Sequence, residues 1–289
     1  MSQAHPAHTL RSGSEAFLRV LFGLFLAIVA IALVFFSPNL YAAVTVLMAL
    51  IASWEWHRMV RSPAQAAELQ PIHIQTAVSA GAIACAVTML VMHQVAVALL
   101  FVVAATAAAF VLARRRDDNP AWHAAGVLYI GLPALALVAL RIYPPKGALV
   151  VLAMFLIVWS TDTGALVFGK LIGGKKMAPK LSPGKTWAGT IGGSVTAALV
   201  FALYLFVIYG ADFNLLFALL FALAFSFVAH GGDLLESAVK RRFGTKDSGG
   251  LIPGHGGVLD RMDSMFACSV VLSLLVFGLH LNPLFGGHV

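Results

Sequence analysis

The sequence predicts an all-α integral membrane protein, a polytopic bundle of about nine transmembrane helices. Of its 289 residues, 60% are hydrophobic and only 11% are charged, whereas soluble globular chains carry roughly 25% charged residues. A chain with so few charges cannot coat a water-facing surface of this size, which excludes an ordinary soluble domain. Nine spans of about 20 residues each would leave only short connections and ends.

Nine apolar stretches are expected to be helical because only closed backbone hydrogen bonding survives in hydrocarbon. In chain order they are Phe17–Phe36, Leu40–Trp54, Ile74–Met92, Val95–Leu112, Ala124–Leu140, Ala148–Phe168, Trp187–Tyr209, Phe213–Ala229 and Met262–Leu281. Arg11 and Arg19 stand near the beginning of the first stretch, as in a secretory signal, but its apolar run exceeds the roughly 7–15 residues of such signals. We therefore expect it to remain as a membrane anchor.

The distribution of basic residues predicts the orientation of the spans, because Lys and Arg collect on the cytoplasmic side of a membrane. With the N-terminus in the cytoplasm, all of the 19 Lys and Arg residues except Arg141 and Lys146 fall on the cytoplasmic side. An odd number of spans then places the C-terminus outside, on the periplasmic face.

Polar residues divide the chain into two regions. Residues 1–140 are predicted to be scaffold spans one to five, and 141–289 a catalytic region of spans six to nine with two cytoplasmic loops. In the first region, the histidines stand singly near helix ends and are expected to be interfacial; they are His57, His73, His93 and His123. In the second region, polar residues enter the apolar stretches themselves.

Asp162 is the first such residue, within Ser160-Thr161-Asp162-Thr163-Gly164. A lone ionised group inside a span costs about 2.5–3.5 kcal/mol on insertion scales, so this carboxylate needs a partner or a cavity. The alternative is that Asp162 caps a broken half-helix with its side-chain oxygens.

A loop rich in lysine and glycine is expected over Gly169–Thr186, with five lysines and four glycines. Within it, Ser182, Lys185 and Thr186 are candidate phosphate ligands, because a lysine and two hydroxyls supply donors while glycine permits close backbone approach. The segment is not a Walker A loop, since Pro179 stands at the position of the first glycine. For the lysines nearer the preceding span, the alternative is that they only set the orientation of that span in the membrane.

Further along, Asp233, Ser237 and Lys240 are spaced i, i+4 and i+7. On a helix they share one face and form a polar stripe. A solvated helix end is the alternative explanation.

Asp260 and Asp263 follow a glycine-rich cytoplasmic loop and would face the same way on a helix. Two like charges near lipid repel one another, so a bound cation is expected, and oxygen ligands favour Mg²⁺. The alternative pairs Asp260 with Arg261 and makes Asp263 a cap. Carboxylates beside basic residues are the parts that phosphoryl or nucleotidyl transfer needs.

The motifs closely resemble the signature of phosphatidate cytidylyltransferases, also called CDP-diacylglycerol synthases. The matching block of 27 residues reads Ser237-x-x-Lys240-Arg241, then Lys246-Asp247-Ser248-Gly249, then Pro253-Gly254-His255-Gly256-Gly257-Val258-Leu259-Asp260-Arg261-Met262-Asp263. Upstream, Asp162-Thr163-Gly164, Ser182-Pro183-Gly184-Lys185-Thr186-Trp187 and Gly232-Asp233 are similar too. The N-terminal half agrees only in having hydrophobic spans.

The resemblance implies that CTP and phosphatidic acid react to give CDP-diacylglycerol and diphosphate, in phospholipid biosynthesis. It also implies dependence on Mg²⁺, with a second, monovalent cation left open, and a homodimer embedded in the lipid of the bacterial inner membrane with its active site facing the cytoplasm. No nucleic acid partner is expected.

Residue roles carry over by position. The implied catalytic residues are Lys240, Asp260 and Asp233, and the implied metal ligands are Asp233, Asp260 and Asp263. The implied substrate-binding residues are Asp162, Ser182, Lys185, Thr186, Ser237, Arg241, Lys246, Asp247, His255, Gly256, Gly257 and Arg261.

Other functions remain as alternatives. A CTP-dependent polyprenol kinase has similar loops but would transfer only a phosphate. An ion-coupled transporter also uses broken helices and intramembrane carboxylates, but it would show inverted repeats, and none is found. A CDP-alcohol phosphotransferase would need an Asp-Gly-x-x-Ala-Arg block, which the sequence lacks.

Overall fold

A computed structural model of the chain describes residues 23–62, 74–251, 256–281 and 284. Eight helices in this part are long and apolar enough to cross a membrane. They are α2 (Pro38–Met59), α4 (Ile74–Val91), α5 (Val95–Arg114), α6 (Pro120–Ile142), α7 (Gly147–Leu171), α8 (Trp187–Tyr209), α9 (Leu215–Arg242) and a last helix over Leu259–Gly278, composed of α10 (Leu259–Ser273) and the π-helical turn η1 (Leu274–Gly278). The predicted all-α membrane fold is confirmed.

The first predicted span, Phe17–Phe36, is described only over Gly23–Phe36, where the chain is helical and apolar. The beginning of that span lies outside the described residues, as do His73 and His255. The seventh predicted span coincides with α8 at both ends.

Part of the expected loop before α8 is a β-hairpin instead. Strands β1 (Lys176–Ala178) and β2 (Ser182–Thr186) pair antiparallel, with Lys176 opposite Thr186. The Thr186 hydroxyl then accepts the backbone N–H of Gly189 at 3.1 Å and caps the N-terminus of α8. The hairpin therefore fixes where the candidate phosphate ligands of this segment lie.

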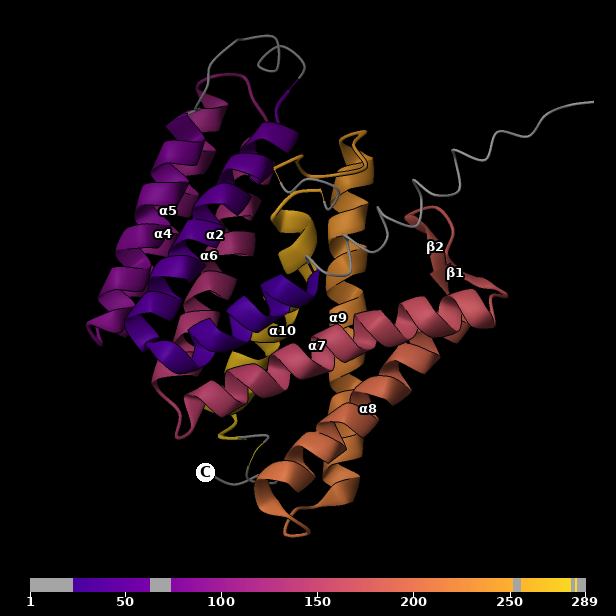
Figure 1. The fold of residues 1–289 in the computed structure, drawn as a ribbon. Coiled ribbons are helices and arrows are strands. Elements are labelled where there is room, and N and C mark those ends of the chain that lie inside the picture. The colour runs from indigo at the N-terminus through magenta and orange to yellow at the C-terminus, as the bar shows by residue number, and fades with distance from the viewer. Residues whose placement is uncertain (1–22, 63–73, 252–255, 282–283, 285–289) are drawn as a thin grey trace, which may run out of the picture.

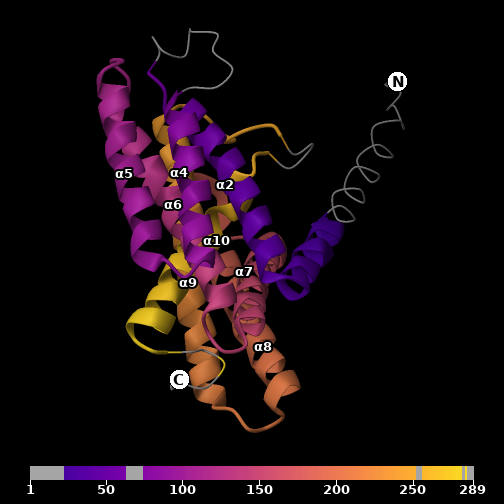
Figure 2. The same ribbon diagram turned by 90° about the vertical axis from the view of Figure 1, so that its left-hand side faces the viewer.

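Two groups of helices meet along α10 (Figures 1 and 2). In one group, α2, α4, α5 and α6 pack side by side. In the other, α7 crosses the molecule obliquely and packs along α8, which also contacts α9. Helix α10 contacts α2, α6, α7 and α9, so residues from both halves of the chain surround it.

The contact between α7 and α8 depends on glycines. A Cβ atom on Gly193 would lie 2.5 Å from the carbonyl oxygen of Thr161, and one on Gly164 would lie 2.6 Å from Thr196 Oγ1. Small residues let two membrane helices approach closely enough for van der Waals packing, which is what holds helices together in lipid.

Helix α7 is continuous through Asp162. The neighbouring Thr161 hydroxyl donates to the carbonyl oxygen of Ile157 at 2.7 Å, within the same helix. The alternative in which Asp162 caps a broken half-helix is therefore wrong, and its carboxylate projects from an intact span.

Helix α9 extends well past the predicted apolar stretch Phe213–Ala229 and ends at Arg242. Hydropathy falls beyond Ala229 because polar residues begin there, but the segment contains no proline that would break a helix. The stripe of Asp233, Ser237 and Lys240 thus lies on a helix, as its spacing predicts.

A buried polar network joins α2, α4 and α6. The Nδ1 atoms of His57 and His123 lie 2.7 Å apart, and both side chains are buried. His57 Nε2 lies 2.7 Å from Ser79 Oγ, and His123 Nε2 lies 2.8 Å from Asp118 Oδ2. The expectation that these two histidines stand singly is therefore wrong. His57 and His123 are 66 residues apart in the sequence, so spacing does not reveal their contact, although Asp118 lies only five residues before His123.

Candidate active site

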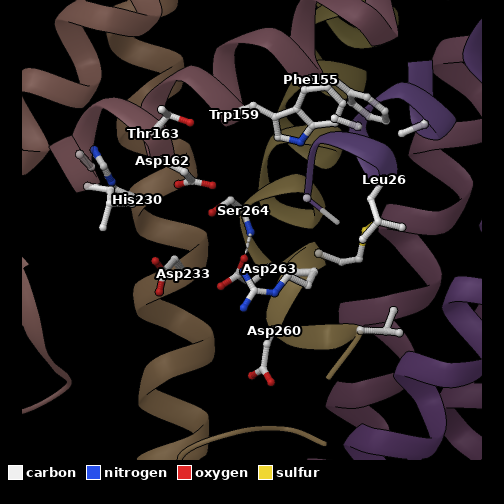
Figure 3. A pocket seen from close by; sticks show the side chains of 18 of the residues that line it. Leu26, Phe155, Trp159, Asp162, Thr163, His230, Asp233, Asp260, Asp263 and Ser264 are labelled. Carbon is white, nitrogen blue, oxygen red and sulfur yellow. Dashed lines mark hydrogen bonds between the residues drawn. The ribbon is translucent and has the colours of Figure 1, made fainter. Parts of the chain in front are cut away.

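A cavity of about 1440 Å³ lies between the two groups of helices. Its polar wall carries Asp162, Asp233 and Asp263, which come from α7, α9 and α10 and face a common space in Figure 3. Its apolar wall includes Trp159 of α7 and Leu26 near the N-terminus. The cavity is therefore charged at one end and apolar at the other.

Asp233 links α9 to the hairpin. Its Oδ2 atom lies 2.6 Å from the ammonium nitrogen of Lys185 on β2, and its Oδ1 atom accepts the Ser237 hydroxyl at 3.3 Å. Since Lys185 also lines the cavity, an anionic ligand there would meet a lysine that is already held by a carboxylate.

Lys240 joins α9 to α10. Its ammonium donates to Asp260 Oδ1 at 2.8 Å and to Glu236 Oε2 at 3.0 Å. The Glu236 side chain is fully buried. Removing one member of a buried ion pair costs about 3–5 kcal/mol, because the remaining charge is left uncompensated. Glu236 is absent from the predicted site residues, although its i, i+4 spacing to Lys240 is a signal for it.

Asp260 is also held by backbone amides of the glycine-rich loop. Its Oδ2 atom accepts the N–H groups of Ser248 at 3.0 Å and of Gly257 at 2.8 Å. Between them, Gly256 has a φ of +80°, and a Cβ atom there would lie 2.7 Å from Asp260 Oδ2. Glycine is thus required at this position both for backbone conformation and for space.

Asp263 and Arg261 complete the α10 side of the cavity. Asp263 is nearly buried, and its Oδ1 atom accepts the N–H of Ser264 at 2.6 Å. Arg261 is exposed and lines the cavity. A guanidinium cation and a carboxylate thus lie on the same side of the cavity.

The structure brings together about half of the predicted site residues. Those that line the cavity are Asp162, Lys185, Thr186, Asp233, Asp260, Arg261 and Asp263. Those described outside its wall are Ser182, Ser237, Lys240, Arg241, Lys246, Asp247, Gly256 and Gly257. His255 lies outside the described residues.

Arg241 has a structural contact that the sequence analysis does not anticipate. Its Nε atom donates to the carbonyl oxygen of Leu181 at 3.3 Å, and its Nη1 atom to that of Thr245 at 3.3 Å. It therefore ties the hairpin to the loop after α9. Lys246 and Asp247, in that loop, are exposed.

Several polar residues of the cavity wall are absent from the predicted set. They include Thr163, Lys170, Lys176, Thr190, His230 and Ser264. Lys170 and Lys176 lie in the segment whose lysines have an alternative role, which is to set the orientation of the preceding span in the membrane. A position near the membrane surface does not distinguish that role from a place in the cavity wall. His230 lies two residues before the Gly232-Asp233 motif, and this closeness is a signal for it.

The aspartate carboxylates of the cavity have the ligand chemistry that a hard cation such as Mg²⁺ prefers. Asp233, Asp260 and Asp263 all line the cavity, and carboxylate oxygens are ligands that Mg²⁺ prefers. Within the described residues, no group of three or more His, Cys, Asp or Glu side chains is arranged to hold one ion. Asp233 and Asp260 are instead paired with lysines, so the metal site stays a prediction.

Comparison with known proteins identifies the family of the chain. The sequence model of the Cytidylyltransferase family matches residues 17–279. The chain is 43% identical over 169 residues to a phosphatidate cytidylyltransferase of Brucella melitensis, an alignment that covers 57% of this chain and 61% of the relative. It is 41% identical over 152 residues to one of Staphylococcus haemolyticus, covering 52% of this chain and 56% of the relative. The chain thus spans at most about three fifths of these relatives, while the family match covers most of its length and shows that it belongs to the cytidylyltransferase family.

Proposed function

We propose that the protein is a phosphatidate cytidylyltransferase, which makes CDP-diacylglycerol and diphosphate from CTP and phosphatidic acid. A phosphate oxygen of phosphatidic acid attacks the α-phosphorus of CTP, and the bond from that phosphorus to the bridging oxygen breaks, so that diphosphate leaves. No protein nucleophile takes part.

The observation that carries the proposal is the mixed character of the cavity. One substrate is a water-soluble nucleotide and the other a lipid, so the site must offer charged groups and an apolar wall together. The cavity has both, since Lys185 and Arg261 lie on the polar side and Leu26 and Trp159 on the apolar side. Family membership and the names of the bacterial relatives support the same reaction.

In this proposal the basic residues bind and orient phosphates. Lys185 and Arg261 reach the cavity directly and would hold phosphate oxygens of the two substrates near one another, which lowers the entropic cost of the reaction. Lys240 keeps Asp260 in place through its 2.8 Å contact. A divalent cation bound by Asp233, Asp260 and Asp263 would supply positive charge to offset the charge on the reacting phosphates.

The proposal extends to location and assembly. The bias of Lys and Arg toward one side favours a cytoplasmic active site, and the bacterial relatives favour the inner membrane. The family resemblance favours a homodimer.

The test is to incubate the purified protein with CTP labelled at the α-phosphorus, phosphatidic acid in detergent micelles, and Mg²⁺. We expect label to pass into the lipid phase and diphosphate to be released. Asp260→Ala should lower the rate by about 100-fold or more, by analogy with loss of other electrostatic groups in active sites. Asp212→Asn, an exposed acid in the turn between α8 and α9, is the matched control and should not change the rate.

Two results would contradict the proposal. Label that remains in water-soluble CDP, with phosphate passed to a lipid alcohol, would indicate the polyprenol kinase alternative. An Asp260→Ala variant that stays folded and keeps the wild-type rate would show that the cavity is not the active site.

A further inference from the structure

Glu55, near the end of α2, holds the glycine-rich loop from the opposite half of the chain. Its side chain is fully buried. Its Oε1 atom accepts the N–H of Val258 at 3.0 Å, and its Oε2 atom accepts the N–H of Leu259 at 2.8 Å and the hydroxyl of Ser248 at 3.2 Å. One carboxylate thus binds both ends of the loop that contacts Asp260.

Two of these donors are at the beginning of α10. Val258 is the N-cap residue of that helix, and it forms no side-chain cap of its own. The first N–H groups of a helix have no partner within it, and a negative charge near them is stabilised by the helix dipole. Glu55 therefore caps α10 from another helix, about 200 residues away in the sequence.

Two glycines of the loop pack against the same carboxylate. A Cβ atom on Gly249 would lie 2.5 Å from Glu55 Oε1, and one on Gly257 would lie 2.6 Å from both of its oxygens. A side chain at either position would force the Glu55 carboxylate to move from its observed place. The glycines of this motif thus serve contact with Glu55 as well as any contact with a nucleotide.

The contacts continue to the candidate active site. Ser248 gives its hydroxyl to Glu55 and its backbone N–H to Asp260. Gly257, next to Val258, also donates its N–H to Asp260. Asp260 in turn binds Lys240. A displacement of the loop from Glu55 would therefore move the donors that fix the Asp260 carboxylate.

We infer that Glu55 is a positioning residue for the active site, which holds Ser248 and the start of α10 so that Asp260 is kept in place for reaction. The inference rests on the proposed function. It assigns to the N-terminal half a direct part in shaping the site.

A neutral amide should not replace the carboxylate. Both oxygens of Glu55 accept hydrogen bonds, whereas Gln offers one oxygen and one NH₂ group, which would face an N–H donor. Glu55→Gln keeps the size of the side chain and removes this acceptor. We expect kcat to fall about 10- to 100-fold, as for other small misplacements of reacting groups, with KM for CTP changed less than about threefold because ground-state binding is retained.

The test compares Glu55→Gln with Ser53→Ala, a buried α2 residue whose hydroxyl has no hydrogen-bond partner in the described part of the chain. Rates are measured with phosphatidic acid micelles per unit of folded protein. Hydrogen exchange of the amides of Ser248, Gly257, Val258 and Leu259 is measured in parallel, without substrates or metal. We expect faster exchange at these amides in Glu55→Gln and wild-type exchange in Ser53→Ala.

A double-mutant cycle tests direct contact. Gly249→Ala should lower kcat in the wild type but have little further effect when Glu55 is already Ala, because the atom it meets is gone. If Glu55→Gln does not fold, Ser248→Ala removes only the hydroxyl contact and should give a smaller change in the same direction.

Wild-type kcat and wild-type exchange in Glu55→Gln would overturn the inference, as would independent effects of the two substitutions in the cycle. Failure of the proposed function is distinct, since the wild type itself would then not turn over CTP with phosphatidic acid. The exchange measurement would in that case still decide whether Glu55 holds the loop.

Discussion

Asp118, between α5 and α6, ends the buried polar chain that begins at Ser79. Burial raises the pKa of this carboxyl, but hydrogen bonds from His123 and from the backbone N–H groups of Ser62 and Asn119 outweigh burial and bring the pKa to about 2. One proton assignment satisfies every contact: Ser79 donates to His57, His57 to His123, and His123 to Asp118. The ionised form of Asp118 is therefore favoured in the folded protein.

This depressed pKa predicts how stability depends on pH. A carboxyl whose pKa is about 2 when folded and about 3.9 when unfolded contributes stability that is complete above pH 4 and is lost as pH falls toward 2. Asp118→Asn should lower the melting temperature in detergent near neutral pH, and this difference from the wild type should shrink below pH 4. Asp117→Asn, its exposed neighbour, should show neither effect. A constant difference at all pH values would contradict the assignment.

Helices are the elements that the sequence predicts best, because hydropathy marks where a span can lie in lipid. The ends of α8 are predicted to the residue. Hydropathy does not mark where a helix stops, however, so α9 runs to Arg242, past its apolar part. The hairpin β1–β2 was missed for a related reason, since five lysines and four glycines carry no alternating pattern that would indicate strands.

The close contact of α7 and α8 predicts a sharp difference between glycines. Gly193→Ala would place a methyl group 2.5 Å from the carbonyl oxygen of Thr161, and overpacking of this kind costs about 1–3 kcal/mol. Gly81→Ala in α4 meets nothing within 4 Å and should be neutral or stabilising by roughly 0.5–1 kcal/mol. Thermal unfolding of both variants in detergent tests this, and equal melting temperatures would show that the helices do not approach so closely.

At the scale of the whole molecule, the candidate site combines what the sequence could and could not predict. Asp233, Asp260 and Asp263 were found because each lies in a continuous motif with helical spacing. Glu55 was not, because its partners lie about 200 residues away and a single glutamate at the end of a span looks like any interfacial charge. The division into a scaffold of residues 1–140 and a catalytic region of 141–289 stays a prediction. Glu55 tests it most directly, because this residue of the first region contacts the loop and helix start of the second.

The orientation of the bundle is the remaining prediction. The hairpin and the turn between α8 and α9 lie at opposite ends of α8 (Figure 1). If basic residues face the cytoplasm, Lys180 in the hairpin is cytoplasmic and Asp212 in the turn is periplasmic; both are exposed. The test introduces Lys180→Cys or Asp212→Cys into a chain without Cys85 and Cys268, and treats intact spheroplasts with a membrane-impermeant maleimide. We expect Asp212→Cys to react at once and Lys180→Cys only after permeabilisation. The reverse order would show that the bundle has the opposite orientation, in which the cavity has no access to cytoplasmic CTP. This measurement therefore also constrains the proposed reaction.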